Sequence, residues 1–236
     1  MKFGVIVFPG SNCDDDMVHV AGDVLGREVV KIWHKETSLP DFKKGDCIVL
    51  PGGFSYGDYV RAGAIAQFSP IMHAVKAFAE QGGFVFGICN GFQVLCESGL
   101  LPGVLLQNAN QKFICKNTFL RTETTQSPLT ANLEKGQVLS IPIAHAEGRY
   151  YADQKTLDAL EANDQVLFRY CSETGELGDA FNPNGAERHI AGICNAERNV
   201  FGMMPHPERA SEDILGNKDG LALFLSLLQT TEAMAV

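Results

Sequence analysis

The 236-residue sequence has no long apolar run and no sign of a targeting segment. No apolar stretch approaches the 18 or more residues that a membrane-spanning helix needs, so we expect no membrane span. Only Met1 and Lys2 precede the first apolar run, which leaves no room for a signal peptide. We therefore predict a cytoplasmic protein that does not bind membranes.

Paired cysteine motifs and basic clusters are also missing. The seven cysteines are an odd number without any C-x-x-C pair, which argues against a disulfide framework and a zinc site. We expect most of them to be small core residues. A net charge of −9, one Trp and no Lys/Arg cluster give no support for nucleic-acid binding. With 45% hydrophobic residues, the chain can bury a large core, and we predict one domain over residues 1–236.

The segment 84–93, Phe-Val-Phe-Gly-Ile-Cys-Asn-Gly-Phe-Gln, carries the clearest chemistry in the sequence. Its first three residues predict the end of a buried strand and a helical pattern begins at Asn90, so Cys89 falls at the turn between them. Such a turn has a strained backbone, and side chains two residues before and after the nucleophile would collide, so Gly87 and Gly91 suit this pattern. The pattern predicts a nucleophile elbow with cysteine as the nucleophile.

A cysteine on such an elbow projects above the sheet at the start of a helix. Backbone N–H groups there can stabilise negative charge and hold an oxyanion, which favours acyl transfer through a thioester on Cys89. A buried structural cysteine between two glycines is the alternative interpretation. Motifs of this length recur by chance, so the rest of the chain has to decide.

Strand-like and helix-like patterns alternate through the first hundred residues. They predict strands at 3–8, 29–34, 47–50 and 84–86, and helices at about 14–25 and 71–79, the second with Ser69 as its cap and Pro70 as its first residue. This rhythm predicts an α/β fold with a doubly wound, mostly parallel sheet and right-handed crossovers. An acidic triplet at 14–16 is interpreted as a solvated helix start, because no His or Glu follows at metal-ligand spacing.

From residue 112 the pattern changes to polar–apolar alternation, which predicts antiparallel or edge strands. This alternation covers the predicted strands at 113–122 and 138–144. Further predicted elements are a short helix near 157–160, strands at 166–171, 190–194 and 200–204, and a core-packed helix at 221–228.

A glycine-rich loop at 51–57, Pro-Gly-Gly-Phe-Ser-Tyr-Gly, directly follows a predicted strand. Asp58 follows Gly57, where a phosphate-binding P-loop would have Lys and then Ser or Thr. We expect the loop's backbone N–H groups to face the ligand site above the strands, where they can serve as oxyanion donors. A tight structural turn is the alternative.

His206, Pro207 and Glu208 follow the last predicted strand. Pro207 biases His206 toward an extended conformation, and a carboxylate two residues away can reach the second ring nitrogen and fix the tautomer. If the strands before Cys89 and His206 are parallel neighbours, the three side chains form a thiol triad. A hydrogen-bonded structural histidine is the alternative.

Together these motifs resemble the class I glutamine amidotransferases, whose fold is flavodoxin-like. The elbow, the Pro-Gly-Gly loop and the late His-Pro-Glu carry the resemblance. Further segments make the chain similar, over nearly its whole length, to the glutaminase subunits of phosphoribosylformylglycinamidine synthases: 51–58, 62–66, 182–185, 190–193 and 204–209.

The resemblance implies catalytic roles for Cys89 as nucleophile, His206 as base and Glu208 as the acid that orients the base. It implies that Gly53 and the Asn90 amide hold the oxyanion. The substrate-binding positions that it implies are Gly52, Gly53, Asn90, Gln93, His145 and Glu147. The family usually has His-Gly-Glu-Gly where residues 145–148 read His-Ala-Glu-Gly, and the extra methyl group can alter that loop's backbone.

The resemblance also implies a function. The chain would hydrolyse L-glutamine and supply ammonia to a large synthetase subunit that makes formylglycinamidine ribonucleotide from formylglycinamide ribonucleotide in purine biosynthesis; a further small subunit is an open alternative. We expect ATP and Mg²⁺ on the synthetase partner, and no cofactor or metal on this chain, which has no P-loop, kinase-type loop or magnesium carboxylate set. A glutaminase serving another synthetase, or a non-enzymatic redox or chaperone protein with a sensor cysteine, are the alternatives.

Overall fold

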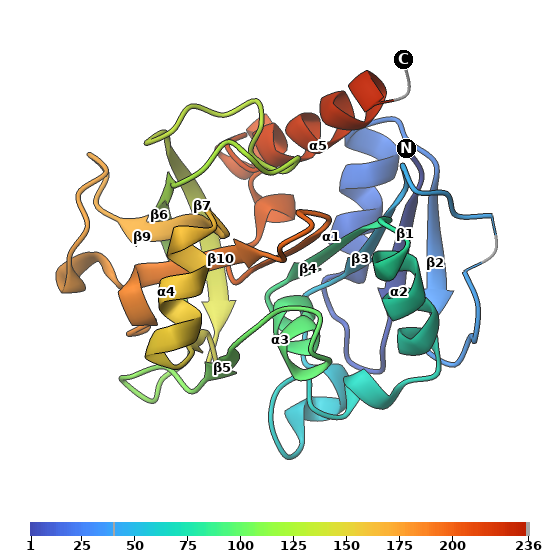
Figure 1. The fold of residues 1–236 in the computed structure, drawn as a ribbon, viewed down its shortest axis with the longest axis horizontal. Coiled ribbons are helices and arrows are strands. Elements are labelled where there is room, and N and C mark those ends of the chain that lie inside the picture. The colour runs from blue at the N-terminus through green and yellow to red at the C-terminus, as the bar shows by residue number, and fades with distance from the viewer. Residues whose placement is uncertain (40, 235–236) are drawn as a thin grey trace.

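The computed structural model describes residues 1–39 and 41–234, and its central feature is a nine-stranded sheet (Figure 1). One half is parallel, in the order β2 (Val29–Trp33), β1 (Phe3–Val7), β3 (Cys47–Leu50), β4 (Phe84–Ile88) and β11 (Val200–Met203). The other half is antiparallel, in the order β10 (Ile190–Cys194), β9 (Val166–Cys171), β6 (Ile114–Thr122) and β7 (Val138–His145). A separate two-stranded sheet pairs β5 (Val104–Leu106) with β8 (Arg149–Tyr151).

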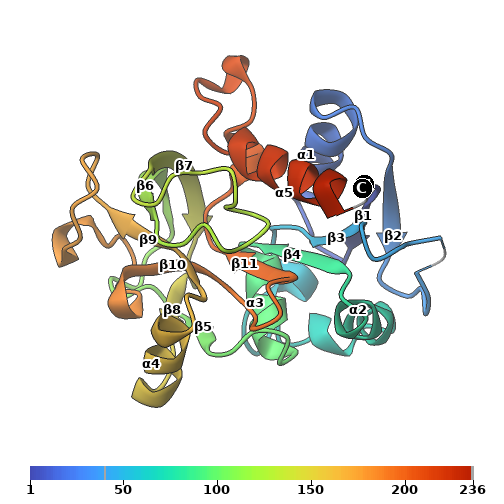
Figure 2. The same cartoon turned by 45° about the horizontal axis from the view of Figure 1, so that its top comes forward.

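Helices cover both faces of the parallel half. They are α1 (Asp14–His19), which a π-helical turn at Val20–Val24 continues, α2 (Ile71–Glu80), α3 (Asn90–Glu97) and α5 (Leu221–Met234). Figure 2 shows α1 and α5 on one face of the sheet and α2 and α3 on the other. Because both faces are covered, β3, β4 and β11 are buried along their whole length and consist almost entirely of apolar residues.

The predicted fold class is confirmed, since strands β2-β1-β3-β4-β11 follow the flavodoxin-like order of a doubly wound sheet. The predicted antiparallel strands are confirmed as well, and β7 alternates buried and half-buried residues along its length. The short strands β5 and β8 were not predicted, because three residues are too few to show a period.

The predicted cap of the second helix is wrong in detail. Pro70 occupies the cap position of α2, and no side chain caps that helix. The Ser69 hydroxyl instead lies 2.9 Å from the phenolic oxygen of Tyr56, which in turn lies 2.6 Å from Nδ1 of His34. Ser69 thus serves a tertiary polar contact in place of the local cap that its position before proline predicted.

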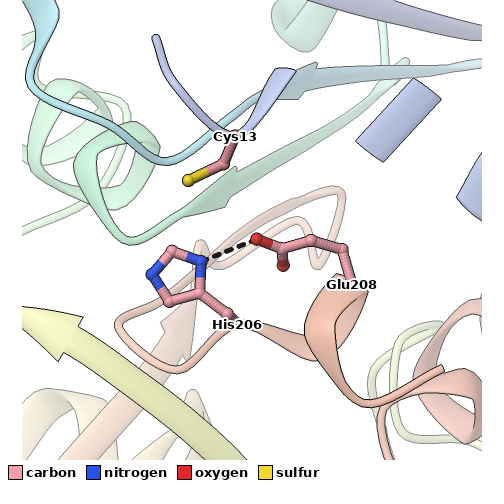
Figure 3. A group of neighbouring side chains, drawn as sticks. All are labelled: Cys13, His206 and Glu208. Atoms are coloured by element: carbon pink, nitrogen blue, oxygen red, sulfur yellow. Dashed lines mark hydrogen bonds and ion pairs between the residues drawn. The ribbon is translucent and has the colours of Figure 1, made fainter. Parts of the chain in front are cut away.

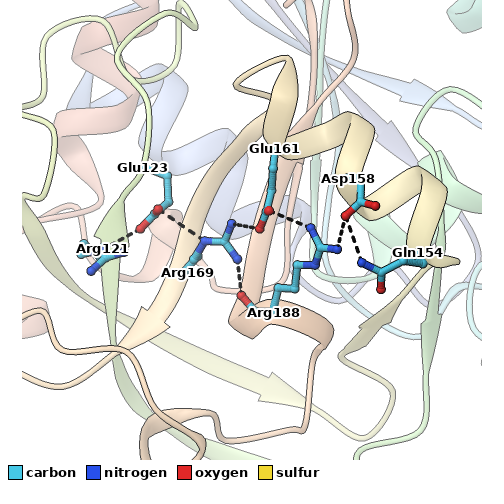
Figure 4. Close-up of polar contacts among 7 residues, drawn as sticks. All are labelled: Arg121, Glu123, Gln154, Asp158, Glu161, Arg169 and Arg188. Atoms are coloured by element: carbon cyan, nitrogen blue, oxygen red, sulfur yellow. Dashed lines mark hydrogen bonds and ion pairs between the residues drawn. The ribbon is translucent and has the colours of Figure 1, made fainter.

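An ion-pair network attaches α4 (Gln154–Ala162) to the antiparallel half (Figure 4). Nη2 of Arg169, on β9, lies 2.7 Å from Oε1 of Glu161, and its Nε lies 3.3 Å from Oε2 of Glu123. Arg188 binds the other oxygen of Glu161 at 2.7 Å. Arg169 is largely buried, and these carboxylates compensate the positive charge of its guanidinium group.

No helix in the described part of the chain combines the length and apolarity needed to cross a membrane. All seven cysteines are free thiols; Cys115 is exposed and the other six are buried, as predicted for most of them.

Candidate active site

Cys89 lies in a strained turn between β4 and α3. Its φ of 51° and ψ of −106° are rare for a residue with a side chain. The N–H group of Cys89 donates to the carbonyl oxygen of Met203, 2.8 Å away, so the turn is fixed to β11. This is the predicted elbow geometry, in which local strain presents the side chain above the sheet.

The glycines beside Cys89 are required by close packing. A Cβ atom on Gly91 would lie 1.8 Å from the carbonyl oxygen of Leu50, and one on Gly87 would lie 2.6 Å from the carbonyl oxygen of Gly91. Both distances are far below van der Waals contact, so neither position tolerates a larger residue without displacement of the backbone. The elbow prediction therefore gave the correct reason for both glycines.

His206 reaches the same edge of the sheet as Cys89. Strands β4 and β11 are parallel neighbours, with Ile88 paired to Met203, and the two residues follow the ends of these strands. Nδ1 of His206 lies 2.6 Å from Oε1 of Glu208, and both side chains are almost completely buried (Figure 3). The carboxylate thus accepts the Nδ1 proton and leaves Nε2 free to exchange one.

The electrostatic surroundings favour a proton on His206. Burial disfavours the imidazolium, but the Glu208 charge, assisted by negative charge on the Cys89 sulfur, outweighs burial and raises the pKa of His206 well above its usual value. Sγ of Cys89 lies 3.7 Å from the carbonyl oxygen of Ala144, and no described group makes a well-aligned hydrogen bond to Nε2 of His206. Catalytic hydrogen bonds of this kind often form or tighten only in the substrate complex.

A small cavity of about 40 Å³ opens beside the elbow. Its lining residues are Gly53, Phe54, Asp58, Cys89, Gln93, Ala144, His145, Ala146 and Glu147. The structure thereby places the predicted residues Gly53, Gln93, His145 and Glu147 around the Cys89 thiol.

Two further predicted residues, Gly52 and Asn90, adjoin this cavity. A Cβ atom on Gly52 would lie 2.7 Å from Cε1 of His206, so glycine lets the loop pack directly on the base. The Asn90 amide group donates to Oε1 of Gln93 at 2.8 Å and to Oδ1 of Asp58 at 3.3 Å. The side chain of Asn90 therefore organises the floor of the cavity.

The loop that contains Ala146 keeps its neighbours in place. Ala146 does not have a positive φ, so its methyl group causes no backbone strain of that kind. Nε2 of Gln93 donates to the carbonyl oxygen of Glu147 at 2.6 Å, and the Ala62 N–H group donates to the Glu147 carboxylate at 3.2 Å. The alanine in place of the family's usual glycine thus leaves Glu147 at the cavity wall.

His145 is a buried, neutral member of the site. Its Nδ1 lies 3.1 Å from Oδ1 of Asn108, a residue that the sequence analysis did not identify. Burial, with a contribution from the charge of His206, lowers the pKa of His145 to about 4, so the ring is uncharged near neutral pH. Its Nε2 has no hydrogen-bond partner among the described residues and is available to a polar group.

Cys13 is a second thiol at the site that sequence reasoning missed (Figure 3). Its Sγ and the ligand atoms of His206 and Glu208 lie within 4.8 Å of one another, the one such potential metal-binding group found in the described chain. Existing contacts account for the arrangement, because His206 and Glu208 bind each other and Arg209 donates to Sγ of Cys13 at 3.0 Å. Cys13 is far from His206 and Glu208 in the sequence, so no local pattern predicts that it joins them.

The acidic triplet beside Cys13 has cationic partners. Lys31 binds Asp14 at 2.9 Å and Asp15, and Arg209 binds Asp16 at 3.1 Å. All three aspartates lie in the first turn of α1, as the sequence interpretation expected of a helix start.

Comparison with known proteins finds that the chain is similar to glutamine amidotransferases. The family model for the CobB/CobQ-like glutamine amidotransferase domain matches residues 1–219. The chain is 56% identical to the phosphoribosylformylglycinamidine synthase subunit PurQ of Salinibacter ruber, covering 99% of this chain and 98% of that one. It is 57% identical to the corresponding subunit of Moorella thermoacetica, with 98% and 97% covered. The structure of PurLQS from Thermotoga maritima contains a similar chain (TM-score 0.84, 43% identity, 97% and 98% covered).

Proposed function

Because this chain belongs to the CobB/CobQ-like glutamine amidotransferase family, we propose that it is the glutaminase subunit of a phosphoribosylformylglycinamidine synthase. The observation that carries the catalytic assignment is the elbow thiol of Cys89 beside a buried His206–Glu208 pair, with a small cavity at the thiol. The family match and the arrangement of the residues therefore support the same chemistry.

The first half of the reaction forms a thioester. The Cys89 thiol transfers its proton to Nε2 of His206, and Sγ attacks the carboxamide carbon of glutamine. Backbone N–H groups of Gly53 and Asn90 hold the resulting oxyanion, and the helix dipole of α3 supports that charge. His206 then gives its proton to the amide nitrogen, the C–N bond breaks, and ammonia leaves a glutamyl thioester.

The second half releases glutamate. His206, again neutral at Nε2, takes a proton from water as the water oxygen attacks the thioester carbonyl carbon. The C–S bond breaks and the proton returns to sulfur, which restores the thiol. Glu208 holds the ring in the Nδ1–H tautomer and stabilises the imidazolium in both halves. No metal or cofactor of this chain is needed for these steps, and the ATP and Mg²⁺ of the overall synthesis belong to the synthetase.

The ammonia serves a synthetase subunit. The relatives are named as subunits of phosphoribosylformylglycinamidine synthase, and the similar structure is a PurLQS assembly. We infer that the chain docks on a large synthetase, which aminates formylglycinamide ribonucleotide, and that a small third subunit joins them. Free ammonia is mostly protonated near neutral pH, so hydrolysis without a receiving partner would waste glutamine.

The structure suggests how docking controls activity. A cavity of about 40 Å³ holds only a few water molecules, far less than a glutamine molecule. Its walls come from separate connections, at Gly53–Phe54, at the Cys89 elbow and at His145–Glu147, so a partner that shifts these connections can open and align the site. A tenfold activation requires only about 1.4 kcal/mol of preferential binding to the aligned state.

The proposal is tested by glutamate release from glutamine while the synthetase and its nucleotide substrate are titrated in. We expect slow release by the isolated chain and at least tenfold faster release in the complex, coupled to product formation. Fast release that no synthetase alters would contradict the coupling but keep the glutaminase assignment. No release under any condition would contradict the glutaminase assignment itself.

A further inference from the structure

The loop that brings Gly53 to the active site has an unusual backbone over residues 53–58. Gly53 has a φ of 137°, and residues 56–58 follow with φ values of 54°, 72° and 53°. Two of these four residues, Tyr56 and Asp58, carry side chains, and left-handed backbone is uncommon for such residues. A backbone of this kind persists only where the surrounding structure fixes it, so the loop depends on its contacts for its shape.

Backbone contacts hold one side of the loop against the turn that follows β1. The Phe54 N–H group donates to the carbonyl oxygen of Gly10 at 2.8 Å. The Tyr56 N–H group donates to the carbonyl oxygen of Pro9 at 2.6 Å. A Cβ atom on Gly53 would lie 2.5 Å from the Gly10 oxygen, so the loop packs directly on this turn. No backbone carbonyl among the described residues accepts from the Gly53 N–H group, which leaves this donor available to a ligand.

The Tyr56 side chain supplies a second attachment, to residues beside β2 and α2. Its phenolic oxygen lies 2.6 Å from Nδ1 of His34, which directly follows β2, and 2.9 Å from the hydroxyl oxygen of Ser69, which precedes α2. His34 is 5% exposed and Ser69 is 3% exposed, so water competes little for these contacts. The rings of Tyr56 and His34 also meet edge to face, with their centroids 5.5 Å apart. One hydroxyl group thus ties the loop to two other parts of the fold.

The protonation state of His34 suits this contact. Burial, with a contribution from the charge of Lys35, lowers the pKa of His34, so the ring is neutral near neutral pH. A neutral ring can accept the phenolic proton at Nδ1, and the Ser69 hydroxyl can then donate to the phenolic oxygen. The three polar groups therefore satisfy one another, and none of the three residues lines the cavity at Cys89.

We propose that Tyr56 is a positioning residue for the glutaminase reaction: its anchored hydroxyl fixes the loop so that the Gly53 N–H group stays aligned with the oxyanion. This inference rests on the proposed function, in which Gly53 and Asn90 hold that charge. The Ser55 N–H group donates to Oδ1 of Asn90 at 3.2 Å, so the same loop is also attached to the residue that supplies the second donor. Oxyanion stabilisation depends on donors that are in place before the charge develops, and an anchor three residues from Gly53 limits how far its N–H group can move.

The test compares two reactions of Cys89 in the glutaminase–synthetase complex. Glutamine hydrolysis passes through an oxyanion, whereas iodoacetamide alkylates the same sulfur by displacement of iodide, without an oxyanion. For Tyr56→Phe we expect kcat for glutamine to fall about 10- to 100-fold with less than about a threefold change in KM, because a misplaced donor weakens only the transition state. The rate of Cys89 alkylation, followed by peptide mass spectrometry, should stay at the wild-type value.

Two further variants complete the test. Tyr59→Phe is the matched control, because it removes the same hydroxyl group from a nearby tyrosine that is 73% exposed, and it should leave both rates unchanged. Ser69→Ala removes only the longer of the two contacts and should lower kcat about 2- to 10-fold, which is the worth of one hydrogen bond. It keeps the test decisive if Tyr56→Phe does not fold.

Three results would overturn the inference: an unchanged kcat in Tyr56→Phe or Ser69→Ala, a loss confined to KM, or equal losses in glutamine hydrolysis and in alkylation. Equal losses would show that the change disturbs the Cys89 elbow and not the oxyanion loop. Wild-type complex without any glutaminase activity would instead refute the proposed function, so the two failures are distinguishable.

Discussion

Replacement of Glu208 by Gln tests whether the buried His206–Glu208 pair acts as a catalytic unit. The two side chains meet at 2.6 Å and are 1% and 3% exposed, so water screens their interaction very little. Glutamine can accept the Nδ1 proton through its amide oxygen, but it supplies no charge to stabilise the imidazolium. If its amide nitrogen faces the ring instead, the proton moves to Nε2 and the base is blocked.

The two outcomes bracket the expected loss. A charge-assisted hydrogen bond contributes about 1.5–3 kcal/mol, which corresponds to about 10- to 150-fold in rate, and a wrong tautomer can cost about 10⁴-fold. We therefore expect Glu208→Gln to lower kcat by about 10- to 10⁴-fold with little change in KM. Glu208→Asp keeps the charge and should recover part of the activity.

The assay is glutamate release at saturating glutamine in the glutaminase–synthetase complex, with synthesis driven by added ammonia as the internal control. The ammonia-driven rate should stay at the wild-type value, because it does not use this site. His206→Ala should abolish most of the activity, and adding Glu208→Gln to it should cause almost no further loss. Independent, multiplicative losses would refute the idea that the two residues act as one unit.

Three further changes should have distinct effects. Cys89→Ser should remove glutamine-dependent synthesis and leave ammonia-dependent synthesis intact, as coupled assays of the complex would show; retained glutamine use would exclude Cys89 as the nucleophile. Asp58→Asn should stabilise the protein by ~1 kcal/mol at pH 8 and not at pH 3, because the pKa of this half-buried carboxyl rises from 3.8 to about 6 on folding. The wild type therefore loses stability as the pH rises through that range. Chemical denaturation at both pH values tests this, and equal effects at both would contradict it. Gly91→Ala should destabilise by several kcal/mol, because its Cβ would meet the Leu50 oxygen at 1.8 Å, and an unchanged melting temperature would show that the elbow can relax.

The catalytic part of the site could be predicted because its signals are local. The glycines on either side of Cys89 are needed for the turn, which a few neighbouring residues form. Glu208 is only two residues from His206 in the sequence, so their contact is also local. The adjacency of their two strands was a condition in the prediction, and the pairing of β4 with β11 fulfils it. The roles of these residues in catalysis are predictions that the mutants above test.

Residues brought to the site by tertiary folding could not be predicted from local pattern. Asp58 served in the sequence analysis only to exclude a P-loop, although the fold carries it to the cavity wall. Asn108 holds His145 across 37 positions, and Cys13 reaches His206 from the far end of the chain. No periodicity or spacing marks such contacts, because they depend on how separate loops meet above the sheet.

Two secondary-structure details also differ from what the sequence pattern predicts. The turn Val20–Val24 is π-helical although the sequence pattern simply continues the helix, and Ser69 exchanges its cap position for a contact with Tyr56. For Ser69, the tertiary contact with Tyr56 replaces a helix cap worth about 1 kcal/mol.

In the proposed mechanism, glutamine is hydrolysed through a covalent glutamyl thioester on Cys89. The most direct measurement mixes the glutaminase–synthetase complex with isotope-labelled glutamine, quenches it with acid within one turnover, and maps the label by peptide mass spectrometry. We predict label on the peptide that contains Cys89 and none on that peptide in Cys89→Ala. The amount of label should increase at low temperature, where slower hydrolysis lets the glutamyl thioester accumulate. Glutamate formation at the full rate with no label on Cys89, or with label on another of the seven cysteines, would contradict this mechanism.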